Sequence, residues 1–294
     1  MIPFASQAGR MIRVAHSPDS DDAFMFYALA EGLIDTDDLV FEHELQDIQI
    51  LNERAMRGEL EVSAVSIHAY AYLADRYLLL PHGASMGEGY GPRLVASRQL
   101  SEAEIRRATV AVPGELTSAY LALHLWAPDV RTVVVPFDRI LDAVRQGEAE
   151  VGLLIHEGQL TYADDGLRLL LDLGAWWKQE TGLPLPLGGN VIRRDLGPTL
   201  IGKVSRLLHE SIRYSLEHRK AAMTYALRFA RGLSPFTADR FVGMYVNERT
   251  LDYGPEGREA VRLFLDMGIQ AGLIPGPLRV EFADQESGSD EGPT

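Results

Sequence analysis

Short hydrophobic runs alternate with segments of helical periodicity over most of the chain. Residues 11–15 (MIRVA) have the length and composition of a strand, and residues 39–45 (LVFEHEL) alternate as a half-buried strand does. Between them, residues 21–32 carry apolar side chains at helical spacing and end on Gly32, which is a helix stop signal. The strands predicted from such runs are residues 11–15, 39–45, 61–65, 77–81, 109–113, 131–136 and 150–155.

Helical patterns fill the intervals between these strands, and the last hundred residues are mostly helical. Because strands that alternate with helices form βαβ units, we expect an α/β fold with mainly parallel sheets. The predicted helices are residues 21–32, 47–59, 66–76, 101–107, 116–126, 137–148, 201–229 and 255–272.

Two segments of the chain echo each other. Residues 56–70 (MRGELEVSAVSIHAY) and 145–158 (RQGEAEVGLLIHEG) each combine a helix end, a glycine, acidic residues and a hydrophobic run. Each run ends on a polar residue, Ser66 in the first segment and His156 in the second. Ligands of open α/β sheets lie outside the carboxyl ends of the strands. Two such units that face each other would form a two-lobed cleft between Ser66 and His156.

Charge and composition narrow the classes of function. The net charge of −14 repels nucleic acid and anionic membrane surfaces, so neither is an expected partner. The chain has no cysteine, which excludes disulfides, thiolate metal sites and a cysteine nucleophile. It has no secretory signal pattern and no apolar run long enough to span a membrane, so we expect a cytoplasmic protein. We expect flexible tails at residues 1–11 and 283–294.

Thr117, Ser118 and Ser66 could each face the cleft or cap a helix, and His156 has two possible roles of its own. Thr117 and Ser118 follow a strand and a turn and open a helix, whose free N–H groups suit a carboxylate or hydroxyl of a substrate. Thr and Ser are also favoured N-caps, and the same choice applies to Ser66. His156 titrates near neutrality and is either a base or a structural residue, whereas His68 is expected on a helix surface.

The stretch HSPDSDDAF (16–24) raises the question of a metal site. Asp19, Asp21 and Asp22 lie between a strand and a helix, where capping and the helix dipole favour acidic residues. Oxygen ligands for a divalent ion are present, but the EF-hand pattern is absent, and we favour the helix start. Ser17 is the better candidate to contact a substrate.

Other motifs argue against a bound cofactor. The glycine-rich segment 86–92 (MGEGYGP) matches neither nucleotide-binding fingerprint, and the chain has no paired-histidine zinc motif. We therefore expect no metal and no cofactor. Trp176 and Trp177 are expected to pack in the core or between lobes rather than to stack on a ligand.

Several longer segments together resemble the 1,4-dihydroxy-6-naphthoate synthases of the futalosine route of menaquinone biosynthesis. The resemblance extends from about residue 12 to residue 275, in the same order. Its most specific parts are IHEGxxTY and WWxxxTGLPLPLG. The segments that carry it are HSPDSDDAFMFYAL, VPGELTSAYLAL, VGLLIHEGQLTY, GAWWKQETGLPLPLGGNVIRRDLG and YVNERTLDYGPEGREAV.

The resemblance implies the two-lobed fold of type II periplasmic binding proteins, with two hinge strands and a central cleft. One lobe would contain residues 12–100 and 191–280 and the other residues 101–190, with hinge crossings near 98–108 and 186–193. The family is a carbon–carbon lyase that splits cyclic dehypoxanthine futalosine and releases 1,4-dihydroxy-6-naphthoate. The histidine that matches His156 is its proposed catalytic base. The residues that would bind the substrate are Ser17, Ser66, Thr117, Ser118 and Asn190.

This chain departs from the family pattern close to the expected substrate. The family's opening usually reads S-P-C-P-N-D-T-F, and its first-lobe serine follows K-L, so a lysine that could pair with a substrate carboxylate is absent here. The departures are at Asp19, Ser20, Asp21, Ala64 and Asn190.

Two other functions fit the same pattern. A solute-binding protein for a small organic anion would have the same fold, since function resides in the site rather than the scaffold. A chorismate dehydratase is the sister enzyme of the pathway, but the IHEG and WWxxxTGLPLPLG blocks favour the synthase. In each case the partner is a small-molecule carboxylate, and the sequence leaves a homodimer open.

Overall fold

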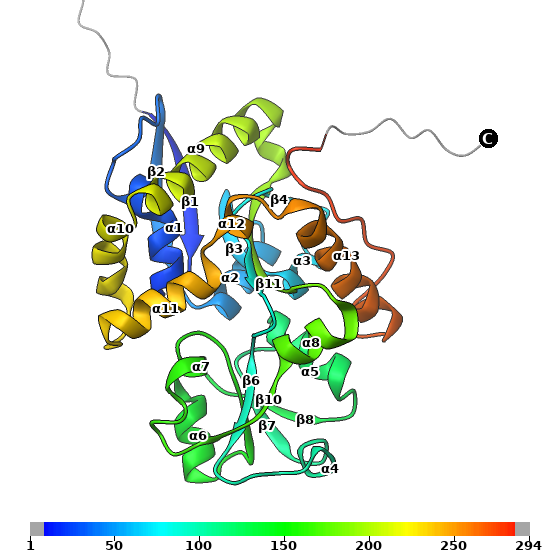
Figure 1. Cartoon of the computed structure of the whole chain (residues 1–294). Helices are drawn as coiled ribbons and strands as arrows, with labels where there is room; N and C mark the ends of the chain where they lie inside the picture. Colours follow the sequence, from blue (N-terminus) through cyan, green and yellow to red (C-terminus); the bar gives the residue numbers. More distant parts are fainter. Residues whose placement is uncertain (1–8, 286–294) are drawn as a thin grey trace, which may run out of the picture.

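The computed structural model describes residues 9–285 and contains two β-sheets, each flanked by helices (Figure 1). Each sheet with its helices forms one lobe, so the predicted two-lobed α/β fold is confirmed. The first sheet contains β1 (Arg10–His16), β2 (Leu39–Leu45), β3 (Val62–Ser66), β4 (Tyr77–Leu79), β5 (Ser85–Gly87) and β11 (Leu185–Arg193). The second contains β6 (Arg93–Ala96), β7 (Thr109–Val112), β8 (Arg131–Val134), β9 (Val151–Leu154) and β10 (Arg168–Asp172).

Helices connect and cover these strands. Those before residue 182 are α1 (Ser20–Ala30), α2 (Ile48–Met56), α3 (Ile67–Tyr70), α4 (Glu102–Ile105), α5 (Ser118–Trp126), η1 (Phe137–Arg139), α6 (Ile140–Gln146), α7 (Gly158–Thr161) and α8 (Leu173–Thr181). The later ones are η2 (Arg194–Leu196), α9 (Pro198–Glu217), α10 (Arg219–Ala226), η3 (Leu227–Phe229), α11 (Pro235–Tyr245), α12 (Glu248–Leu251) and α13 (Gly254–Gln270).

The sheets are mixed, whereas the sequence predicted mainly parallel ones. The first sheet has the order β2-β1-β3-β11-β4, with β5 also paired to β11, and the second has the order β10-β6-β9-β7-β8. The antiparallel pairs involve β6, β10 and β11, which lie next to the points where the chain changes lobe. A parallel neighbour needs a crossover within one lobe, and a strand that arrives from the other lobe is free of that constraint.

The chain passes between the two sheets twice. The first passage lies between Gly87 and Arg93, and the return lies between Asp172 and Leu185 and contains α8. Both passages precede the predicted lobe boundaries at residues 100 and 190, because β6 pairs within the second sheet and β11 within the first. We propose that the lobes divide at these two passages.

The two largest hydrophobic cores lie in the first lobe and between the lobes. In the first lobe, α1, α9, α10 and α11 lie together on one side of the sheet (Figure 1), and Phe24 of α1 and Leu208 of α9 are fully buried there. A second core is continuous between the lobes, since it includes Val65 of β3 and Val110 of β7. Trp177 is buried in this shared core, as the sequence predicted.

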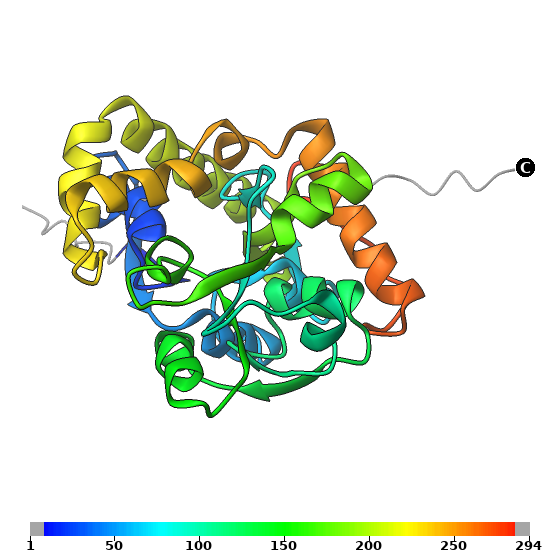
Figure 2. The same cartoon turned by 60° about the horizontal axis from the view of Figure 1, so that its bottom comes forward.

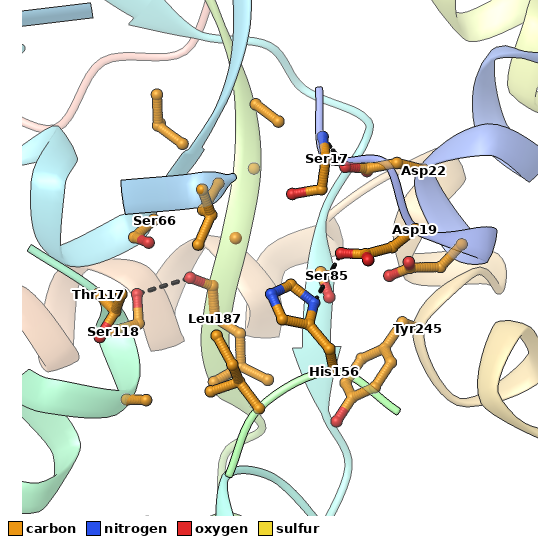
Figure 3. A pocket seen from close by; sticks show the side chains of 18 of the residues that line it. Ser17, Asp19, Asp22, Ser66, Ser85, Thr117, Ser118, His156, Leu187 and Tyr245 are labelled. Carbon is orange, nitrogen blue, oxygen red and sulfur yellow. Dashed lines mark hydrogen bonds and ion pairs between the residues drawn. The ribbon is translucent and has the colours of Figure 1, made fainter. Parts of the chain in front are cut away.

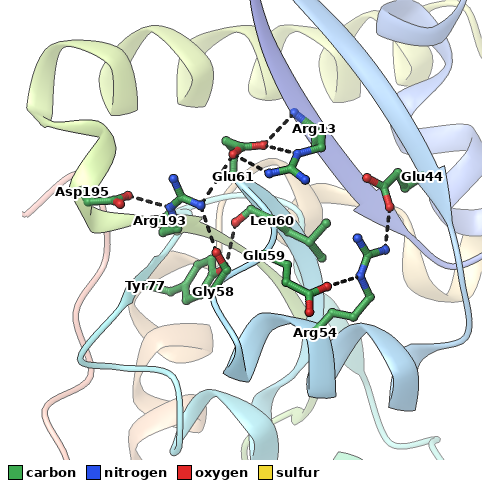
Figure 4. A network of polar contacts seen from close by, with 10 residues as sticks. All are labelled: Arg13, Glu44, Arg54, Gly58, Glu59, Leu60, Glu61, Tyr77, Arg193 and Asp195. Carbon is green, nitrogen blue, oxygen red and sulfur yellow. Dashed lines mark hydrogen bonds and ion pairs between the residues drawn. The ribbon is translucent and has the colours of Figure 1, made fainter.

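An ion-pair network connects three strands of the first sheet at the end of β3 that is opposite to Ser66 (Figure 4). Glu61 accepts hydrogen bonds from the backbone N–H and from Nε of Arg13, at 3.2 and 2.9 Å, and lies 3.6 Å from Arg193 Nη1. Burial opposes ionisation of Glu61, but these contacts lower its pKa overall. The network fixes the order of β1, β3 and β11.

The ends of the described chain differ from the predicted tails. Residues 1–8 and 286–294 lie outside the described residues, but Arg10 and Met11 pair with β2 in β1. At the other end, the N–H of Ala283 donates to the carbonyl oxygen of Leu79. Among residues 9–285, none of the helices combines the length and apolar character that crossing a bilayer requires.

Candidate active site

A pocket lies between the two lobes and contains about 750 Å³ of empty space, part of which opens to solvent (Figure 3). Figure 2 shows α11 of the first lobe side by side with the α7 segment of the second lobe where the lobes meet. The structure brings all six side chains predicted for the site to this one pocket. They are Ser17, Ser66, Thr117, Ser118, His156 and Asn190.

His156 is held in a fixed position after β9. Its backbone has φ of +54°, a left-handed conformation that a non-glycine residue rarely adopts. Its Nδ1 lies 2.8 Å from Oδ2 of Asp19, and the ring of Phe137 packs edge-on at a centroid distance of 4.8 Å. Figure 3 shows the other ring nitrogen turned toward the side of the pocket that carries Ser66 and Ser118.

The pairing of His156 with Asp19 determines the charge of both groups. Burial by itself lowers the pKa of His156, but the adjacent Asp19 carboxylate favours the charged ring so strongly that the pKa rises to about 9. Burial likewise disfavours an ionised Asp19, yet His156 and Arg231 hold the pKa of Asp19 below its usual range. Arg231 Nη2 lies 2.8 Å from the second carboxylate oxygen. His156 and Asp19 therefore form an ion pair at neutral pH.

The other two aspartates of the opening stretch behave differently. Asp22 Oδ2 accepts a hydrogen bond of 2.8 Å from the N–H of Ser17, and burial raises the pKa of Asp22 to about 7. Burial and the neighbouring carboxylates raise the pKa of Asp21 well above its usual range. Within residues 9–285, no three acidic or histidine side chains are arranged to hold a metal ion. Asp19 instead engages His156 and Arg231.

Ser66 is fixed by a reciprocal pair of hydrogen bonds with Asn52. The amide nitrogen of Asn52 donates to Ser66 Oγ at 3.1 Å, and the N–H of Ser66 donates to Asn52 Oδ1 at 2.9 Å. Ser66 precedes α3, but its side chain does not cap that helix as we had expected. Because Oγ already accepts from Asn52, its own proton is free to be donated into the pocket.

The N-terminus of α5 forms the wall of the pocket that faces His156. Thr117 is the predicted N-cap, and its Oγ1 accepts from the N–H of Tyr120 at 3.2 Å and donates to the carbonyl of Gly114 at 2.8 Å. The hydroxyl of Thr117 is thereby occupied. Ser118 and Ala119 also line the pocket, and they carry the first N–H groups of α5, which have no acceptor within the helix. These groups are the anion-binding feature of the site.

Asn190 lies in the pocket wall on β11 and is 1% exposed. Its amide nitrogen has no hydrogen-bond partner among the described residues. It sits so close to Gly83 that a Cβ there would come within 2.1 Å of the amide nitrogen, so only glycine fits opposite Asn190. The unsatisfied amide is available to a ligand.

His68 contradicts its predicted place on a helix surface, since it is 3% exposed. The predicted helix over 66–76 is only the four-residue α3, which packs against α5. His68 Nδ1 donates to the carbonyl of Thr117 at 3.2 Å, and its backbone N–H donates to Ser118 Oγ at 3.1 Å. Burial lowers the pKa of His68 to about 4. It therefore positions the start of α5 as a neutral ring.

Sequence reasoning missed the groups that link the lobes around His156. Tyr245 of α11 shares a hydrogen bond of 2.8 Å with Gln159 of α7, and both line the pocket. Arg231 lies between α10 and α11 and places its guanidinium 4.4 Å from the centre of the Phe137 ring. Gln159 stands in the IHEGQ segment, which offered a signal. Tyr245 opens the segment YVNERTLDYGPEGREAV, which offered one as well, whereas the sequence around Arg231 offered none.

Comparisons with known proteins agree with this architecture. The model of a family described as menaquinone biosynthesis matches residues 12–270. A 1,4-dihydroxy-6-naphthoate synthase of Thermus thermophilus is 42% identical over 267 residues, which cover 90% of this chain and 97% of that protein. A solved structure of a protein from Archaeoglobus fulgidus is 46% identical, with a TM-score of 0.87, and covers 92% of this chain and all of that one.

More distant structures share the fold. An alkanesulfonate-binding protein of Xanthomonas axonopodis, solved with MOPS, has a TM-score of 0.68 at 13% identity, and the match covers 92% of this chain and 96% of that one. At this identity the likeness concerns the fold alone. It agrees with the predicted fold of type II periplasmic binding proteins.

Proposed function

Since the chain belongs to the menaquinone biosynthesis family, we propose that it is the carbon–carbon lyase that converts cyclic dehypoxanthine futalosine to 1,4-dihydroxy-6-naphthoate. One observation carries the proposal. His156, paired to Asp19 at Nδ1, turns its other nitrogen into an interlobe pocket whose opposite wall carries hydroxyl and N–H donors. Such a constellation supports proton transfer to and from a bound hydroxylated acid.

The substrate carboxylate binds at the N-terminus of α5. The N–H groups of Ser118 and Ala119 and the free proton of Ser66 are donors suited to an anion. Among the described residues that line the pocket, none is lysine or arginine. The positive end of the helix dipole therefore takes the place of the lysine that the family has before its first-lobe serine.

His156 performs the proton transfer. In its neutral form, the ring nitrogen that faces the pocket removes the proton of a substrate hydroxyl next to the bond that breaks. The oxygen of that hydroxyl then forms a carbonyl, and the carbon–carbon bond cleaves. The electron pair passes to the ring system of the leaving fragment, whose carbonyl accepts it, and the imidazolium returns its proton to that fragment. Aromatisation of the fragment to the dihydroxynaphthoate favours the forward reaction.

Closure of the lobes would protect this chemistry. Tyr245 of the first lobe and Gln159 of the second meet in the pocket wall, as do Asp19 and His156. Water excluded by this closure cannot intercept the carbanion or solvate the base.

Incubation of the purified protein with cyclic dehypoxanthine futalosine tests the proposal. We expect naphthoate to appear by absorbance and by mass, also after treatment with EDTA. Chorismate serves as the second substrate, and thermal shifts with both compounds report binding. Stabilisation by cyclic dehypoxanthine futalosine without product would indicate a solute-binding protein, and product from chorismate alone would indicate a dehydratase. Either outcome would overturn the proposed lyase function.

A further inference from the structure

We propose that Asp19 is a positioning residue, which holds His156 from across the cleft so that one defined ring nitrogen faces the substrate. This inference rests on the proposed function, because it concerns the group that would act as the base. Asp19 does not need to touch the substrate. Its Oδ2 lies 2.8 Å from Nδ1 and pairs with the N–H there, so the proton stays on Nδ1. The other ring nitrogen is then the one that can accept a proton.

The two partners belong to different lobes. Asp19 follows β1 of the first sheet and precedes α1, whereas His156 follows β9 of the second sheet. Neither sheet alone can form the pair. The contact is also dry, since the Asp19 side chain is 1% exposed and that of His156 is 16% exposed. Closure of the lobes would therefore both enclose the substrate and orient the base.

Each carboxylate oxygen of Asp19 has an ion-pair partner. While Oδ2 contacts His156, Oδ1 lies 2.8 Å from Arg231 Nη2. Arg231 in turn lies over the ring of Phe137, which packs against the imidazole from the second lobe. The four side chains form a closed ring of contacts between the lobes. A carboxylate held in this way can position its partner, whereas a free one could rotate away.

Several other charged groups surround His156 and must be counted. Asp21 and Glu157 favour the charged ring. The charge of the ring in turn favours ionisation of Asp22 and of Asp47. Burial raises the pKa of each of these four carboxyls. Arg231 opposes the charge of the ring through its own. Of these groups, only Asp19 lies within hydrogen-bond distance of the ring, and it is the main source of the raised pKa of His156.

The test compares the wild type with Asp19→Asn, which keeps the size of the side chain and removes its charge. Asp284→Asn is the matched control, because Asp284 forms an ion pair with Arg258 outside the pocket. The first readout is the NMR titration of the histidine rings between pH 5 and 10, in which the signal of His156 is assigned by its loss in His156→Asn. We expect His156 to titrate near 9 in the wild type and at least two units lower in Asp19→Asn.

The second readout is the pH profile of kcat/KM with cyclic dehypoxanthine futalosine. In the wild type the rate should rise with pH toward about 9, because only the neutral ring is a base. In Asp19→Asn this limb should move down with the pKa of His156, and the plateau should fall by about 10²-fold or more. Asp284→Asn should leave both unchanged.

The outcomes separate this inference from the proposed function. Wild-type His156 that titrates at or below 6.5 would overturn the positioning role, even if Asp19→Asn fails to fold. So would an Asp19→Asn profile that keeps the limb and the plateau of the wild type. If the substrate is not turned over at all, the proposed lyase fails, while the titration still decides whether Asp19 holds His156.

Discussion

Ser118 Oγ donates a hydrogen bond of 2.6 Å to the carbonyl oxygen of Leu187, which lies on β11 in the first lobe (Figure 3). Ser118 Oγ in turn accepts a hydrogen bond from the N–H of His68. Ser118 starts α5, the helix that connects β7 and β8 of the second sheet. The hydroxyl therefore joins the two lobes at the place where we propose that the substrate carboxylate binds. Its side chain is occupied by the protein, and its backbone N–H is left for a ligand.

Ser118→Ala should weaken the interlobe contact and spare the chemistry. Loss of the hydroxyl leaves a buried carbonyl and a buried N–H without their partner, which costs about 1–3 kcal/mol of folding free energy. The carboxylate site at α5 becomes less well positioned, so KM should rise several-fold while kcat stays within about threefold. Steady-state kinetics and urea unfolding measure these effects. A large fall in kcat with unchanged KM would instead give Ser118 a direct part in the reaction.

His156→Asn should remove the proposed base without disturbing the backbone. Asparagine is among the residues that tolerate a φ of +54°, and its amide can still donate to Asp19. It cannot accept a proton at neutral pH, so turnover should fall by about 10²–10⁴-fold with little change in ligand affinity. Turnover and a thermal melt in the presence of the substrate measure both effects.

The control for this variant is His218→Asn, since His218 is exposed on the first lobe, away from the pocket. It should leave turnover unchanged. If His156→Asn unfolds the protein, the histidine has a structural role. If binding weakens while turnover is intact, it is an orienting donor.

His68→Asn should destabilise the protein, although its sequence suggested a surface residue. The ring is buried, stacks on Tyr120 at an interplanar angle of 2°, and donates to the Thr117 carbonyl. Truncation removes this packing and one of the two hydrogen bonds to the Thr117 carbonyl, which keeps the one from the N–H of Leu121. We therefore expect a loss of about 1–3 kcal/mol of folding free energy. Thermal melts against His218→Asn provide the comparison. Equal melting temperatures for the two variants would contradict the structural role.

The sequence predicted those parts of the site that depend on local pattern. A strand that ends on a polar residue and a helix that begins with Thr117 and Ser118 are visible without a structure, and they led to one pocket. The rule that ligands lie beyond the carboxyl ends of strands then brought Ser66 and His156 together. Ser17 came from the stretch between the first strand and the first helix, and Asn190 was singled out as a departure from the family pattern near the expected substrate.

The parts that depend on contacts between distant segments were not predictable. Helical periodicity identified residues 201–229 and 255–272 but neither α11 nor the surface that each helix meets, so Tyr245 and Arg231 were missed. The sequence does not link Asp19 to a histidine, because its partner comes from the other lobe. His68 was misplaced because the length of a short helix depends on what packs around it.

The buried histidine His82 should make stability depend on pH. It is 2% exposed and its Nε2 contacts Ser205 Oγ, while Nδ1 has no partner among the described residues. Burial lowers the pKa of His82 to about 3, against 6.5 for an unperturbed histidine. Between these values the unfolded chain binds a proton that the folded chain does not. The contribution of His82 to the free energy of unfolding is therefore greatest above pH 6.5 and falls as the pH decreases toward 3.

Comparison of the wild type with His82→Asn isolates this contribution. The stability of the wild type relative to the variant should decrease by about 1.4 kcal/mol for each pH unit below 6.5. Urea unfolding at pH 7.5, 6.0, 5.5 and 5.0 measures the difference, and equal m-values would confirm that the two proteins expose the same surface on unfolding. Stability curves that stay parallel over this range would mean that His82 is protonated in the folded protein. The unpartnered Nδ1 would then have to find an acceptor by local rearrangement around Ser205, and the burial of His82 would no longer oppose its charge.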